Sequence, residues 1–215
     1  MTYSNHIAAL NELSASEGVF TTAQAARLGI TRNALSQAVT SGRAERIVHG
    51  AYRLAGTRSD FTDELAAIWK LTDPAAFTHE RMQIGAWDGI TIGGSTAASL
   101  QSLGDFYLSP YRIYAPRRIN SRLKPASIAI RRVDPDDVSW IKGLPVTRPE
   151  RTLVDLCLDN EEWSLVEDSF NSADNLDYDR LVNIIADQPE RKSVQESLSA
   201  IRGLMERRLD KDRPA

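Results

Sequence analysis

The chain has 215 residues, of which 42% are hydrophobic and 26% are charged, and its formal net charge is −3. This composition excludes a disordered or low-complexity protein, and the length allows two modest domains that each bury a core. No apolar run approaches the roughly 20 residues of a transmembrane helix, and residues 1–6 lack the basic start of a signal peptide, so we expect a cytoplasmic protein without membrane contact. The single cysteine, Cys157, excludes an internal disulfide, and its apolar neighbours predict a buried, structural side chain.

Charge is distributed unevenly along the chain. Residues 1–59 carry six arginines against three acidic residues, and residues 106–133 carry seven positive charges and no acidic residue. Residues 159–187 reverse the pattern, with nine acidic residues and one arginine. Because local fields decide partners more than the net charge does, we expect one basic and one acidic face.

Residues 21–40 have the pattern of a helix-turn-helix, preceded by an amphipathic helix that ends near Gly18. Thr21 and Gln24 have the spacing of a capping box, which predicts a helix start. Gly29 readily adopts the left-handed conformation that ends a helix. Thr31 is the expected N-cap of the second helix. Leu35, Ala38 and Val39 share the inner face of that helix, and its outer face is polar and includes amide and guanidinium groups suited to base contacts in the major groove.

A β-hairpin is predicted directly after this helix. Residues 44–48 and 51–54 are short β-forming runs on either side of His49-Gly50, and a hairpin in this place is the wing of a winged helix. Arginines beside the recognition helix are expected to contact phosphates. The predicted DNA-binding residues are Thr31, Arg32, Asn33, Ser36, Gln37, Arg43, Arg46, His49 and Arg53. The alternative is a helical subdomain that merely packs on the rest of the chain, and the hairpin and the basic bias favour the winged helix.

Small polar residues at 55–59 predict a boundary between a DNA-binding domain, residues 1–59, and a second domain, residues 60–215. The second domain is expected to begin with a helix from Phe61 through Leu71. It continues with strands over 111–115 and 128–133, and with helices over 150–158, 161–173, 178–186 and 193–209. The predicted fold class is α+β: an N-terminal winged helix-turn-helix, then a mixed α/β domain with a helical C-terminal part.

Four segments resemble, in this order, motifs of AbiEi-type antitoxins. Residues 49–54 (His-Gly-Ala-Tyr-Arg-Leu) look like the end of that family's winged helix. Three segments are similar to the family's C-terminal domain: residues 94–100 (Gly-Ser-Thr-Ala-Ala-Ser-Leu), 113–116 (Ile-Tyr-Ala-Pro) and 143–156 (Gly-Leu-Pro-Val-Thr-Arg-Pro-Glu-Arg-Thr-Leu-Val-Asp-Leu).

The resemblance implies a DNA-binding antitoxin of a type IV toxin-antitoxin or abortive-infection system, a form of phage defence. Members of this family typically repress their own operon through the winged helix, and their C-terminal domain counteracts a nucleotidyltransferase-like toxin. The implied partners are double-stranded operator DNA and a cognate toxin. The alternative is a free-standing transcriptional regulator whose second domain senses a ligand or dimerises. A nucleotidyltransferase gene directly downstream would favour the antitoxin.

The longest of these motifs also has a physical interpretation. Thr147 and Glu150 have the spacing of a capping box, and Pro149 would lie in the first helical turn, where its missing N–H costs little. Arg151 and Asp155 are four residues apart, so they can pair along one helix face. We expect this motif to be mainly architectural.

The basic stretch of the second domain surrounds the two predicted strands, with tyrosines interleaved. It consists of Arg112, Arg117, Arg118, Arg122, Lys124, Arg131 and Arg132. Such a run is commonly a solvated face, but cations with aromatic groups also suit nucleic acid or an acidic protein partner. These three interpretations stay open.

An enzyme is not expected. A nuclease needs clustered carboxylates and usually a lysine, whereas the acidic residues of 159–187 are predicted to lie on several faces of helices. Gly93 to Thr96 lack the surrounding pattern of a phosphate-binding loop, so a helix start capped by Ser95 is favoured. No Gly-x-Ser-x-Gly pattern is present, and the histidines lack metal-ligand spacing, so we expect no catalytic residue, cofactor or metal.

Overall fold

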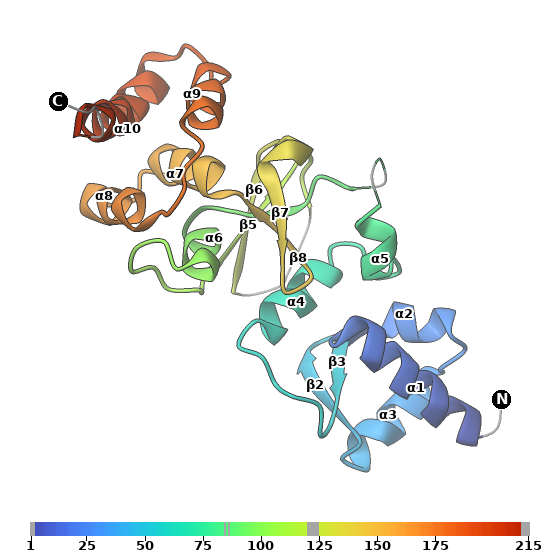
Figure 1. Cartoon of the computed structure of the whole chain (residues 1–215). Helices are drawn as coiled ribbons and strands as arrows, with labels where there is room; N and C mark the ends of the chain where they lie inside the picture. Colours follow the sequence, from blue (N-terminus) through green and yellow to red (C-terminus); the bar gives the residue numbers. More distant parts are fainter. Residues whose placement is uncertain (1–2, 84, 86, 120–124, 212–215) are drawn as a thin grey trace. The chain divides into compact units, whose positions relative to one another are not determined.

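The structure is a computed structural model that describes residues 3–83, 85, 87–119 and 125–211. Its contacts divide the chain into two compact units, Met1–Asp88 and Gly89–Ala215. Figure 1 shows the elements of both units, coloured from blue at the N-terminus to red at the C-terminus. Arg122 and Lys124, two members of the predicted basic stretch, lie outside the described residues.

The first unit combines helices with a three-stranded antiparallel sheet of order β1-β3-β2. The hairpin of β2 and β3 follows α3, as the winged helix requires, and turns at Gly50 with φ of 91°. The elements are α1 (Tyr3–Glu17), β1 (Phe20–Thr21), α2 (Thr22–Arg27), α3 (Arg32–Thr40), β2 (Ala44–Val48), β3 (Ala51–Leu54), α4 (Asp63–Lys70) and α5 (Thr78–Arg81).

Local sequence signals explain the helix-turn-helix. The Thr21 hydroxyl accepts from the Gln24 backbone N–H at 3.0 Å, and the Gln24 side chain accepts from the Thr21 N–H at 2.9 Å, so the predicted capping box is present. Gly29 has a φ of 75°, which ends α2, and Thr31 accepts from the Ala34 N–H at 3.1 Å to cap α3. The core beneath them includes Leu13, Phe20, Ile30, Leu35 and Ala38.

Residues 60–88 belong to the first unit by packing, although the predicted boundary lay after Ser59. Ala67 and Leu71, on α4 and directly after it, pack with Val19 and Ala51. The Lys70 ammonium forms a buried ion pair with Glu17 of α1. Since these contacts tie α4 to α1 and the sheet, the compact unit extends to Asp88.

The second unit contains a five-stranded mixed sheet of order β6-β5-β4-β8-β7. The β5–β6 and β4–β8 pairs are parallel, and β4–β5 and β7–β8 are antiparallel. The strands are β4 (Thr91–Ile92), β5 (Tyr111–Ala115), β6 (Ala126–Ile130), β7 (Val138–Ile141) and β8 (Leu144–Thr147). The helices are α6 (Gly94–Gln101), η1 (Pro135–Asp137), α7 (Pro149–Leu158), α8 (Trp163–Ser172), α9 (Tyr178–Ala186) and α10 (Lys192–Lys211).

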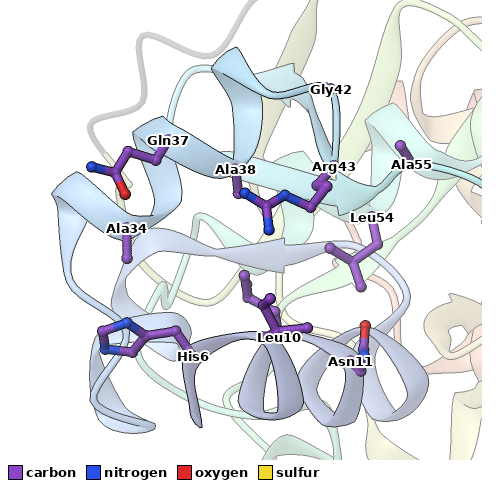
Figure 2. A pocket seen from close by; sticks show the side chains of 11 residues that line it. His6, Leu10, Asn11, Ala34, Gln37, Ala38, Gly42, Arg43, Leu54 and Ala55 are labelled. Carbon is purple, nitrogen blue, oxygen red and sulfur yellow. The ribbon is translucent and has the colours of Figure 1, made fainter. Parts of the chain in front are cut away.

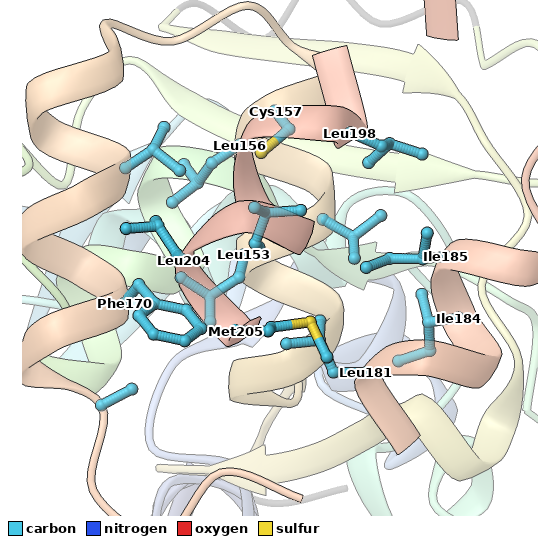
Figure 3. Close-up of a cluster of buried hydrophobic side chains, with 14 of the residues drawn as sticks. Leu153, Leu156, Cys157, Phe170, Leu181, Ile184, Ile185, Leu198, Leu204 and Met205 are labelled. Atoms are coloured by element: carbon cyan, nitrogen blue, oxygen red, sulfur yellow. The ribbon is translucent and has the colours of Figure 1, made fainter. Parts of the chain in front are cut away.

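A buried cluster joins the C-terminal helices around α7 (Figure 3). Leu153 and Leu156 of α7 meet Phe170 of α8, Leu181 of α9 and Leu198 of α10. Cys157 lies in the same cluster and is buried, as predicted. The helical C-terminal part and the α+β class with its N-terminal winged helix-turn-helix are therefore confirmed.

Two helix starts differ from the sequence prediction. The N-cap of α7 is Arg148, and no side chain caps it. Thr147 instead ends β8 and shares a hydroxyl hydrogen bond with Thr152, while Glu150 accepts from the Asp177 N–H at 2.9 Å. The capping box predicted for Thr147 and Glu150 was wrong because tertiary contacts use both side chains. At α6 the N-cap is Gly93, so Ser95 lies inside the first turn and does not cap it.

Candidate nucleic-acid interface

The outer face of α3 presents five of the predicted DNA-binding residues to solvent. They are Thr31, Arg32, Asn33, Ser36 and Gln37, all exposed. The opposite face buries Leu35 and Ala38 in the core of the unit. Because the buried face fixes the rotation of α3, the polar side chains form one surface rather than a ring around the helix.

The wing and the residue before it add exposed basic side chains to this surface. Arg43 is exposed, and its Nε donates to the Ser41 hydroxyl at 3.0 Å. Arg46 is exposed on β2, with its guanidinium 5.6 Å from the centre of the Tyr52 ring, within the range of a cation–π contact. His49 is exposed at the turn of the hairpin. We call α3 together with Arg43, Arg46 and His49 the docking surface.

Arg53 does not join the docking surface. Its side chain is 11% exposed, and its guanidinium donates to Asp63 at 2.9 Å and to Glu45 at 2.5 Å. These hydrogen bonds raise the pKa of Arg53, with Glu45 as the largest cause. Arg53 therefore fixes β3 to α4. The sequence could not show this, because Asp63 lies beyond the boundary predicted at residues 55–59.

The basic stretch of the second unit separates into two groups. Arg117, Arg118 and Arg132 are exposed. Arg112 and Arg131 turn toward the acidic end of α7: Arg112 Nε donates to Asp159 Oδ2 at 3.0 Å, and Arg131 Nη2 donates to Asp159 Oδ1 at 2.7 Å. The stretch is therefore not one continuous solvated patch.

Arg131 is the centre of a network of charged side chains. Its Nη1 donates to Asp155 Oδ1 and to the Tyr114 hydroxyl, both at 2.9 Å, and its guanidinium lies 4.4 Å from the Tyr114 ring centre. Arg151 Nε donates to the same Asp155 oxygen at 3.1 Å, which is the predicted pair within α7. Burial raises the pKa of Asp155 to about 6. Such a network supports the fold rather than a partner, because its charges are used internally.

The interleaved tyrosines are divided in the same way. Tyr107 is 88% exposed, whereas Tyr111 and Tyr114 are buried on β5. A base-stacking platform would need several exposed rings, and the described part of this stretch presents Tyr107 alone. One signal for the network was available: Arg151, Asp155 and Asp159 recur every four residues and thus share one face of α7.

Catalytic, metal and membrane features were also sought in the structure. Within the described ranges, no group of three or more His, Cys, Asp or Glu side chains is arranged to hold a metal ion. Across the same residues, every helix is too short or too polar to cross a membrane.

The segment that carries the docking surface matches a known family model. Residues 8–55 match a family model described as transcriptional regulator, AbiEi antitoxin. This match confirms the resemblance predicted from the sequence, over the segment that forms the winged helix. The matched family is one of regulators and not a known enzyme family.

The fold is also similar to that of a solved structure. The crystal structure of the RV2827C protein from Mycobacterium tuberculosis aligns with a TM-score of 0.56 at 15% identity, covering 93% of this chain and 77% of that chain. At this identity the similarity concerns the fold alone. No curated protein matches the sequence.

Proposed function

We propose that this chain is a DNA-binding antitoxin that represses its own operon through the docking surface and counteracts a nucleotidyltransferase-like toxin through the part of the chain after the winged helix. The observation that carries the DNA-binding part is the exposed polar face of α3 beside exposed Arg43 and Arg46. This surface lies within the residues that match AbiEi antitoxin regulators.

The docking surface suits double-stranded DNA in two ways. Asn33 and Gln37 can each make bidentate hydrogen bonds to adenine in the major groove, and Arg32 can contact guanine, with each good pair worth about 1–3 kcal/mol of discrimination. Arg43 and Arg46 would contact phosphates, which set the position of the protein and supply salt-dependent affinity. Base contacts then select the operator, and phosphate contacts hold the chain on any duplex.

The test compares binding of the promoter upstream of the gene with binding of a random duplex of equal length. Replacing Asn33 and Gln37 by alanine should lower the preference for promoter DNA by about tenfold or more. Replacing Arg46 by alanine should weaken binding to both duplexes alike and reduce the slope of log affinity against log salt by about one.

The matched control is Arg191→Ala, an exposed arginine of the second unit, which should change neither affinity nor slope. Promoter binding that survives the combined change of Asn33, Gln37 and Arg46 would remove α3 and the wing as the docking surface. If instead the intact chain binds the two duplexes equally, operator recognition is wrong and only general DNA affinity remains.

A further inference from the structure

The first unit has a partly open cavity of about 260 Å³ between α1, α3 and the two ends of the β2–β3 hairpin (Figure 2). The cavity opens to solvent, since Asn11, Gln37 and Arg43 on its rim are exposed. Its volume lies just below the range of ligand sites, about 300–1,000 Å³. A cavity of about 150 Å³ already holds benzene. The space therefore fits a compact molecule of one or two rings.

The lining combines an apolar wall with donors of hydrogen bonds. Leu10, Ala38 and Leu54 form much of the wall, and Leu10 and Ala38 are buried. His6, Asn11, Gln37 and Arg43 supply polar groups, and none of the residues named as lining the cavity, all of them in the described part of the chain, is acidic. Figure 2 shows the Arg43 guanidinium over the cavity, on the side opposite Leu10. An apolar wall beneath a guanidinium favours an anionic, mostly apolar ligand.

Two lining residues also belong to the docking surface. Gln37 lies on the polar face of α3, and Arg43 precedes the wing. A carboxylate bound to the Arg43 guanidinium occupies the group that would otherwise contact a DNA phosphate. A carboxylate bound in the cavity and a DNA phosphate would therefore compete for the Arg43 guanidinium.

We propose that this cavity binds a small monocarboxylate with an apolar body of one or two rings, and that the bound carboxylate weakens DNA binding by engaging Arg43. The effect on DNA rests on the proposed function, whereas occupancy of the cavity does not. The chain would thus be a repressor whose winged helix itself senses an organic acid.

The first test measures binding by titration calorimetry on the full chain, with naphthalene-2-carboxylate as the probe and the uncharged naphthalene-2-carboxamide as its match. The carboxylate should bind about tenfold more tightly, because a charge-assisted hydrogen bond to guanidinium is roughly twice as strong as a neutral one. Arg43→Met should remove this difference. Equal affinities for the two probes in the unchanged chain would overturn the proposal.

The second test fills the cavity. Ala34→Phe places a ring in the space beside the half-buried Ala34, and Ala8→Phe adds the same ring at an exposed position of α1 that does not line the cavity. Ala34→Phe should abolish carboxylate binding, and Ala8→Phe should leave it unchanged. Sedimentation measures the oligomeric state of the unchanged chain and of both variants. If Ala34→Phe converts a dimer into a monomer, a second copy of the chain covers the cavity and the ligand site is wrong.

The third test adds promoter DNA. Saturating carboxylate should raise the dissociation constant of the promoter complex about fivefold to tenfold, and the carboxamide should not, since one phosphate contact is lost. If the carboxylate binds the cavity but promoter affinity stays the same, the competition is wrong. If the carboxylate binds and the chain has no preference for promoter DNA, the proposed function fails while the ligand site stands.

Discussion

At the scale of single residues, burial decides the chemistry of Cys157. Its thiol lies in the cluster of α7, α8, α9 and α10, and burial raises its pKa to about 12. The thiolate is the reactive form, so at neutral pH the folded chain holds this group as an inert, small apolar side chain. A role in redox sensing would require an exposed thiol with a lowered pKa.

We therefore predict that Cys157 is protected from thiol reagents until the second unit opens. At pH 8, Ellman's reagent should label the folded chain more slowly than the chain in guanidinium chloride by a factor on the order of 10³ or more, because reaction waits for a rare opening. Free glutathione measured in both solutions controls for solvent effects on the reagent. Rapid stoichiometric labelling of the folded chain would show that the cluster around Cys157 is open.

Arginines show most clearly what could be predicted at the residue scale. Arg43 and Arg46 were assigned to a DNA-contacting surface, and the structure leaves them exposed there. Arg53 was assigned to the same surface, and Arg131 to a basic stretch whose role stayed open, but carboxylates bind both side chains: Asp63 at 2.9 Å, and Asp155 at 2.9 Å. A list of charges along the chain carries no information on such pairing, because the pairing depends on the packing of other elements.

At the scale of elements, strong local signals were sufficient to predict α2, α3 and the wing from the sequence. A capping box, a glycine at the helix end and a Gly-containing turn each act within a few residues, so their outcome is visible in the sequence. β4 and the β7–β8 pair escaped prediction. β4 has only two residues and is defined by its pairing with β5 and β8, which are distant in sequence.

The N-caps of α2 and α3 differ in burial, so removing each cap is expected to lower the free energy of unfolding by a different amount. Thr31 is exposed and caps through one hydrogen bond, so Thr31→Ala should reduce the free energy of unfolding by about 1 kcal/mol. Thr21 is fully buried, and its hydroxyl also donates to the Pro74 carbonyl, so Thr21→Ala should cost about 2 kcal/mol or more. Urea unfolding followed by far-UV circular dichroism measures both changes.

Two further variants make this comparison specific. Thr31→Ser keeps the capping oxygen and should restore most of the lost stability. Thr40→Ala replaces an exposed threonine at the other end of α3, where it caps nothing, and should cost little. Equal stability of the Thr31→Ala and Thr40→Ala variants would show that the Thr31 cap does not support α3.

At the scale of the whole molecule, the packing of α4 moves the boundary between the two units. Composition at residues 55–59 predicted that the second domain begins before α4. The buried Glu17–Lys70 pair and the Arg53–Asp63 pair instead tie α4 to the winged helix. Breaking one partner of a buried pair is costly, about 3–5 kcal/mol. The segment after the wing therefore supports the DNA-binding unit.

A division into two units predicts that repression and antitoxicity can be separated in the full chain. We consider the combined variant Asn33→Ala, Gln37→Ala and Arg46→Ala, whose changes lie on exposed side chains and leave the core intact. It should lose repression of a reporter placed behind the promoter of the operon, because base and phosphate contacts are removed together. It should still restore growth of cells that express the nucleotidyltransferase encoded beside the gene, because neutralisation is proposed to use another part of the chain.

The control is the unchanged chain, expressed from an unrelated promoter at a level matched by immunoblot, so that altered repression does not change the amount of protein. Loss of growth rescue in parallel with loss of repression would mean that neutralisation itself requires DNA binding. Failure of the unchanged chain to rescue growth, or the absence of a neighbouring nucleotidyltransferase gene, would reject the antitoxin and favour the free-standing regulator. In that regulator the winged helix would keep its role, and the second unit would act in dimerisation or ligand sensing.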